Sequence, residues 1–164
     1  MRLFFLCLLL LLATSTSAAN KVLKLSELIG NWQGAGEMVL PGVDISMELT
    51  GEALIGYDSA GDFYRTAITA EKFLFVYSDS GHLFSDGSDT GIVWELWNSF
   101  GQHLRLSGVI DEQAMRGSQR FGSKTYHLEL KQITADSLSA VITQSRKSAT
   151  NRVVGQFGLR RVKP

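Results

Sequence analysis

Residues 43–50 read Val-Asp-Ile-Ser-Met-Glu-Leu-Thr, so apolar and polar side chains alternate without a break. A period of two places Val43, Ile45, Met47 and Leu49 on one face and the polar residues on the other. This pattern is typical of a β-strand with one buried face. Apolar residues also alternate in four later segments: Phe73, Phe75 and Tyr77; Ile92, Trp94 and Leu96; Leu104, Leu106, Gly108 and Ile110; Tyr126, Leu128 and Leu130.

Turn-forming residues separate these segments at hairpin-like intervals. They fall at positions 41–42, 58–61, 78–81, 86–89, 98–101, 111–113 and 135–137. Such intervals leave no room for crossover helices. Only residues 23–29 have helical character, and they predict a short helical or 3₁₀ lead-in. Residues 114–124 fit either a bent strand or a loop over an opening.

The predicted strands number eight to ten and follow one another as a single meander. A twisted sheet of that size, with one apolar face and no helices to cover it, must close on itself or split into two layers. Closure is the simpler solution for a meander. We therefore expect an all-β fold, an antiparallel up-and-down β-barrel of eight to ten strands with a short N-terminal helical lead-in.

Size and composition fit one globular domain. The chain has 164 residues, 45% of them hydrophobic and 20% charged, which excludes disordered, collagen-like and coiled-coil classes. Sixteen basic and sixteen acidic residues balance to a net charge of zero. A nucleic-acid partner is not expected, because the balance of charge argues against a protein that must neutralise many phosphates.

The N-terminus has the features of an export signal. Met1 and Arg2 precede an apolar run over residues 3–13, and small residues follow up to Ala19. A helix of that length spans about 16 Å, roughly half of a bilayer's hydrocarbon core, so the run is too short for a membrane anchor. We expect a signal peptide over residues 1–19, an exported periplasmic or extracellular domain over residues 20–164, and no transmembrane segment after cleavage. The single cysteine, Cys7, would be removed with the signal.

Charge is distributed unevenly along the chain. Residues 25–100 contain twelve acidic and two basic residues, whereas residues 101–164 contain eleven basic and four acidic residues. If the two halves are neighbours in one sheet, opposite charges face each other across strands. If they lie on opposite sides, the protein is a dipole with a basic face. That face would be formed by Arg146, Lys147, Arg152, Arg160, Arg161 and Lys163.

Residues 28–36 read Leu-Ile-Gly-Asn-Trp-Gln-Gly-Ala-Gly. Gly30 permits the turn into the strand, while Gly34 and Gly36 share a face with Trp32 and leave room for its ring or for a passing backbone. The segment resembles the opening of calycin β-barrels: lipocalins, fatty-acid-binding proteins and, most closely, nitrobindin-like and lipocalin-like bacterial domains. Nitrobindin-like proteins open with Leu-x-Gly-x-Trp-x-Gly-x-Gly, matched here from Leu28 to Gly36.

This resemblance implies how the barrel closes. Lipocalins stack an arginine of the last strand on the opening tryptophan, which implies Arg160 or Arg161 over Trp32, a cation–π contact of about 0.5–2 kcal/mol. The barrel-closing residues would be Gly30, Trp32, Gly34, Gly36, Arg160 and Arg161. Nitrobindin-like haem proteins place the iron-binding histidine near the C-terminus, but here no histidine follows His127. Haem binding of that kind is not expected, and neither is another cofactor.

The sequence carries no strong signal for catalysis or metal binding. The histidines are His82, placed beside a predicted turn, and His103 and His127, on the polar faces of predicted strands; they lack the spacing of a metal motif. Residues 79–89 contain possible calcium ligands, yet they lack the order of a helix–loop–helix site and fit hairpin turns better. Hydrolase, phosphate-loop and dinucleotide motifs are absent from the sequence. We expect a protein that is not an enzyme, with no catalytic or metal-binding residues.

Two functions fit such a barrel. In the first, the interior binds a small hydrophobic or amphipathic ligand, with tyrosine hydroxyls as polar handles. The expected lining residues are Met47, Phe75, Tyr77, Trp94, Leu106, Tyr126 and Phe157. In the second, side chains fill the interior and the protein acts through its surface in the cell envelope, where the basic C-terminal segment would bind an acidic partner or anionic lipid.

Overall fold

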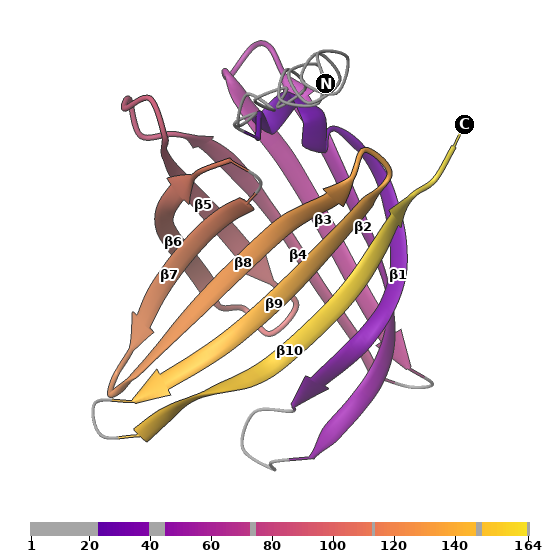
Figure 1. Cartoon of the computed structure of the whole chain (residues 1–164), viewed down its shortest axis with the longest axis vertical. Coiled ribbons are helices and arrows are strands. Elements are labelled where there is room, and N and C mark those ends of the chain that lie inside the picture. The colour runs from indigo at the N-terminus through magenta and orange to yellow at the C-terminus, as the bar shows by residue number, and fades with distance from the viewer. Residues whose placement is uncertain (1–22, 40–44, 73–74, 113, 147–148, 164) are drawn as a thin grey trace, which may run out of the picture.

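The computed structural model describes residues 23–39, 45–72, 75–112, 114–146 and 149–163. Ten antiparallel strands form a closed barrel in which consecutive strands pair and β1 also pairs with β10 (Figure 1). The expected all-β up-and-down barrel is confirmed. The elements are η1 (Leu25–Leu28), β1 (Gly30–Val39), β2 (Ser46–Asp58), β3 (Phe63–Lys72), β4 (Phe75–Ser85), β5 (Gly91–Asn98), β6 (His103–Ile110), β7 (Ala114–Phe121), β8 (Lys124–Thr134), β9 (Ser137–Arg146) and β10 (Ala149–Arg161).

One predicted turn is wrong. Residues 78–81 lie within β4, so His82, expected beside a turn, lies in a strand as well. Serine, aspartate and glycine are typical of turns, but here Gly81 faces inward, and a Cβ on it would lie 2.1 Å from the carbonyl oxygen of Glu95 on β5. The glycine therefore allows two strands to approach closely. The expected signal peptide, the predicted turn at 41–42, Val43 and Phe73 lie outside the described residues.

The open question at residues 114–124 is resolved as a strand and a turn. β7 ends at Phe121, and Gly122 then takes a left-handed φ of +56° that starts β8 in the opposite direction. The inward positions of β7 are Met115, Gly117, Gln119 and Phe121. A glycine and a glutamine interrupt this row, which explains why the apolar alternation fades there.

One end of the barrel, termed the closed end, is packed around Trp32. Trp32 and Leu28 are fully buried, and the indole N–H of Trp32 donates to the Leu28 carbonyl oxygen at 2.9 Å. The backbone N–H of Leu23 donates to the carbonyl oxygen of Asp111 at 3.2 Å, which ties the lead-in to the β6–β7 connection. The 3₁₀ lead-in expected at residues 23–29 is present as η1. Within the described ranges, no helix is long and apolar enough to cross a membrane.

Inward-facing glycines allow close contact between strands where the wall bends. A Cβ at Gly34 would lie 1.8 Å from the carbonyl oxygen of Gly158, and a Cβ at Gly108 would lie 1.7 Å from that of Arg116. Both oxygens belong to the neighbouring strand of the ladder. Any larger residue at these two positions would force the strands apart.

The strand order determines where the acidic half and the basic half of the chain lie. Because the meander runs once around the barrel, residues 25–100 form the wall from β1 to β5, and residues 101–164 form the wall from β6 to β10. The ion pair between Arg105 and Glu95, 2.8 Å long, crosses the β5–β6 seam. The ion pair between Arg116 and Glu129, 2.6 Å long, joins two residues of the second half. The acidic and basic halves of the chain thus occupy opposite sides of the wall.

Candidate ligand site inside the barrel

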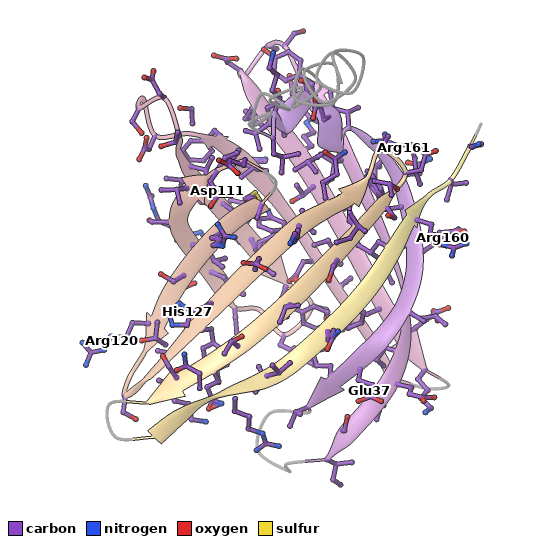
Figure 2. All side chains as sticks on the ribbon, viewed as in Figure 1. Glu37, Asp111, Arg120, His127, Arg160 and Arg161 are labelled. Atoms are coloured by element: carbon purple, nitrogen blue, oxygen red, sulfur yellow. The ribbon has the colours of Figure 1, made fainter. Side chains whose placement is uncertain are left out.

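The two C-terminal arginines have different surroundings. The guanidinium carbon of Arg161 lies 4.3 Å from the ring centroid of Trp32. The same guanidinium donates hydrogen bonds to the backbone carbonyls of Ile29 and Glu27, the latter at 2.7 Å. Arg160 instead is exposed and points away from the wall (Figure 2). Arg161 is therefore the residue that covers the tryptophan and fixes the lead-in to β10.

Toward the other end, the inward-facing side chains are less completely buried. Met38 faces Met47 across β1 and β2, and both side chains keep solvent-exposed surface, whereas Met115 at the closed end is 2% exposed. Other large apolar or aromatic inward-facing side chains with exposed surface include Tyr77, Leu104, Leu106, Tyr126, Leu128, Ile142 and Phe157. The space that they surround is termed the cup. Its floor is the packed closed end. Its wall combines these apolar and aromatic side chains with polar residues at inward register positions, namely Lys72, Gln119, Lys124 and Gln144.

Five of the seven predicted lining residues belong to the cup wall: Met47, Tyr77, Leu106, Tyr126 and Phe157. Trp94 also faces inward, but it lies in the packed core, where its indole N–H donates to the hydroxyl oxygen of Thr66 at 2.9 Å. Phe75 occupies an inward register position opposite Lys72 of β3. Its side chain lies outside the described structure.

The hydrogen-bond ladder of the cup wall is interrupted between β6 and β7. It joins residues 107–110 to residues 115–118 and stops there. Beyond that point, the backbone N–H of Arg105 donates to the side-chain oxygen of Gln119 at 2.8 Å instead of to a backbone carbonyl. Leu104 and Phe121 therefore lie on strand segments that are not paired with each other.

β4 places a carboxylate inside the barrel. Asp79 lies between Ile68 of β3 and Asn98 of β5 in an inward row, and it is only 9% exposed. Its Oδ2 accepts a hydrogen bond from the Tyr77 hydroxyl at 2.7 Å, while its buried Oδ1 has no hydrogen-bond partner among the described residues. Burial raises the pKa of Asp79, and the hydrogen bond from Tyr77 offsets part of that increase. Burial and the neighbouring carboxylate also raise the pKa of Tyr77.

Sequence reasoning missed Asp79 because residues 78–81 were predicted to form a turn. The alternation itself contains the signal that would have found it. Extending the row of Phe73, Phe75 and Tyr77 by two residues places Asp79 on the same inward face. A carboxylate at an interior strand position is unusual, and such positions are often functional.

Exposed aromatic side chains lie at the end of the cup opposite Trp32. Phe100, in the β5–β6 turn, is 63% exposed, and its ring centroid lies 5.7 Å from that of Tyr77. Phe121, at the end of β7, is also exposed and lies 6.1 Å from Tyr126. Each exposed ring thus contacts an inward tyrosine, which gives the entrance an apolar edge.

The three histidines lie on the outer wall. His82 and His103 flank Trp97, whose ring stacks on that of His103 at 4.9 Å. Trp97 is 43% exposed and lies on the outer face. His127 forms a hydrogen bond with the Ser145 hydroxyl at 3.1 Å. In the described part of the chain, no group of three or more His, Cys, Asp and Glu residues is placed to hold a metal ion.

The basic residues of the C-terminal segment do not form one cluster. Arg152 lies near the start of β10 and Arg160 near its end, about 26 Å apart at 3.3 Å per residue. Arg161 is engaged at the closed end, and the side chains of Arg146 and Lys147 lie outside the described structure. The described basic side chains of this segment therefore do not lie on a single patch.

No protein-family model and no curated protein matches the sequence. The S-type phycobiliprotein lyase from Guillardia theta is similar, with a TM-score of 0.59 and 10% identity over 85% of this chain and 91% of the lyase. Rv2717c from M. tuberculosis has a TM-score of 0.56 and 14% identity, covering 85% of this chain and 95% of its own.

A protein of unknown function from the DUF3598 family of Nostoc punctiforme is also similar, with a TM-score of 0.55 and 14% identity over 87% of this chain. The match covers 50% of that protein, so this chain spans about half of its length. Identities this low establish a shared fold and nothing finer. The protein is thus a closed ten-stranded antiparallel barrel that shares its fold with these three structures.

Proposed function

We propose that the protein binds a small amphipathic ligand in the cup. The observation that carries this proposal is the gradient of burial along the barrel interior. Inward residues at the closed end, such as Trp32 and Leu83, are buried, whereas Met38, Tyr126 and Phe157 face the same interior and keep exposed surface. In a barrel filled by its own side chains, only residues at the rim would keep exposed surface, whereas here the mid-strand inward residues Leu106, Leu128 and Phe157 keep it as well.

The chemistry of the wall favours a ligand with a large apolar part. Each square ångström of apolar surface that a ligand removes from water contributes about 25 cal/mol, before the cost of association is subtracted. Tyr77 and Asp79 are two of the inward polar groups beside that apolar wall, and they would orient the ligand. Lys72, Gln119, Lys124 and Gln144 also occupy inward register positions toward the entrance. The fold also fits this use, because barrels of similar size hold one small ligand in lipocalins.

The proposal can be tested with an uncharged fluorescent probe, N-phenyl-1-naphthylamine. In the Leu104→Trp variant, a larger inward side chain would occupy the cup, and we expect the probe affinity to fall by about tenfold or more. Val109→Trp is the matched control, because Val109 lies on the same strand, is exposed and faces outward. Equal affinity in both variants, or no fluorescence change with the wild-type protein, would count against binding in the cup.

We also propose that residues 1–19 direct export of the barrel. In support, every strand of the closed barrel lies between residues 30 and 161, so the apolar N-terminal run is not needed to complete the wall. Mass spectrometry of the protein recovered from its native compartment would test this. A mature N-terminus at residue 20 is expected, and a retained Met1 would contradict it.

A further inference from the structure

The buried carboxylate of Asp79 is the interior group that packing explains least. A carboxylate withdrawn from water is stable only when its oxygens are hydrogen-bonded or paired with a cation. Tyr77 satisfies Oδ2 at 2.7 Å, but Oδ1 lacks a partner, and no ion pair to Asp79 is formed within the described ranges. An apolar residue at this position would pack in the barrel without that cost.

Asp79 is also close to the entrance of the cup. Its partner Tyr77 contacts Phe100 of the exposed β5–β6 turn. Its cross-strand neighbour Asn98 is the last residue of β5 before that turn. The unpartnered oxygen therefore belongs to an inward row at the end of the barrel where the wall keeps solvent-exposed surface.

We propose that Asp79 Oδ1 accepts a hydrogen bond from a nitrogen-bearing group of the ligand, so that the cup selects amphipathic amines and other N–H donors. This inference rests on the proposed function. An ammonium group would supply both the missing hydrogen bond and the compensating charge, and charge-assisted bonds are the strong ones. An alcohol could supply the hydrogen bond alone. A carboxylate of the same length would be repelled by a carboxylate in a poorly solvated site.

The raised pKa of Asp79 is consistent with this arrangement. Burial disfavours the charged carboxylate, and a bound ammonium group would favour it. Tyr77 is held in place by its hydrogen bond to Oδ2 and by its contact with Phe100, so Asp79 is oriented before any ligand arrives. A preoriented acceptor keeps the entropic cost of binding low.

The test compares three probes with the same twelve-carbon chain: dodecylamine, 1-dodecanol and dodecanoate. Isothermal titration at pH 7 with the wild-type protein should give the tightest binding for the amine, by about tenfold over the alcohol, and the weakest for the carboxylate. In Asp79→Asn, the amine should lose about tenfold in affinity, while the alcohol should change by less than about threefold. The control is Asp89→Asn, which removes an exposed carboxylate in the β4–β5 turn. This variant should bind all three probes as the wild type does.

The outcomes separate this inference from the proposed function. If the alcohol binds but the amine has no advantage, or if Asp79→Asn leaves the amine affinity unchanged, the role of Asp79 is overturned and the cup remains a binding site. If none of the three probes binds, both proposals fail. The comparison of probes on the wild-type protein needs no variant, so it holds even if a substitution perturbs folding.

Discussion

Replacement of Arg161 by methionine should loosen the closed end of the barrel. The variant keeps a similar hydrocarbon stem but loses the cation–π contact with Trp32, 4.3 Å from the ring centroid, which contributes about 0.5–2 kcal/mol. It also loses the hydrogen bonds to the Ile29 and Glu27 carbonyls, which contribute about 1.5–3 kcal/mol each when the donor is charged. The Arg161 side chain is 26% exposed, so water would replace part of these interactions.

We therefore expect Arg161→Met to lower the free energy of unfolding by about 3 kcal/mol, which at this size is about 6–12 °C in Tm. The assay is urea unfolding followed by tryptophan fluorescence, since Trp32 reports directly on the closed end. Arg160→Met is the control, because Arg160 is adjacent in sequence but exposed on the outer face. It should stay within about 0.5 kcal/mol of the wild type. Equal losses in the two variants would refute the assigned role of Arg161.

Three further substitutions test other parts of the structure. Gly34→Ala should lower the free energy of unfolding by about 2–3 kcal/mol, because the new Cβ would lie 1.8 Å from a backbone oxygen. Gly158→Ala is the control and should be nearly neutral, because a Cβ there meets nothing within 4 Å. Similar melting curves for the two variants would contradict the close approach of β1 and β10. Asp79→Asn should be more stable than the wild type at pH 7. The folded wild-type protein binds the Asp79 proton more tightly than the unfolded chain does, so it loses stability as the pH rises above 3.8 and that proton is released. The asparagine variant has no such proton to lose. Urea midpoints measured from pH 7 downward should therefore converge, and a constant difference would count against a raised pKa. Trp94→Phe should lower the free energy of unfolding by about 1–3 kcal/mol, because the Thr66 hydroxyl would lose its hydrogen bond from Trp94. Thermal unfolding measures this difference, and an unchanged stability would argue against that hydrogen bond.

Much of the fold could be predicted because most inward rows of the barrel are apolar. The rows from Leu104 to Ile110 and from Tyr126 to Leu130 face inward as their alternation indicated. The prediction was wrong where a small residue allows two strands of the wall to lie close together. In the sequence, Gly81 predicts a turn, but in the structure it lies within β4 where β5 is too close for a Cβ.

The site could be predicted only in part, because alternation gives the direction of a side chain but not its depth. Met47 and Met115 have the same inward parity, yet one faces the cup and the other is sealed in the core. The difference depends on which end of the barrel the lead-in and Trp32 close, and that follows from tertiary packing. The opening motif around Trp32 predicted a closed barrel, and the similar solved structures share that fold.

The methionines offer the most direct test of a barrel that is packed at one end and accessible at the other. Besides Met1, the chain has three methionines: Met38 and Met47 on the cup wall, and Met115 at the closed end. A titration with N-phenyl-1-naphthylamine can be followed by NMR of their ¹³C-labelled ε-methyl groups. We predict that the signals of Met38 and Met47 shift while that of Met115 stays in place. A shift of Met115 alone, or saturable binding that moves none of the three, would contradict ligand binding in the cup.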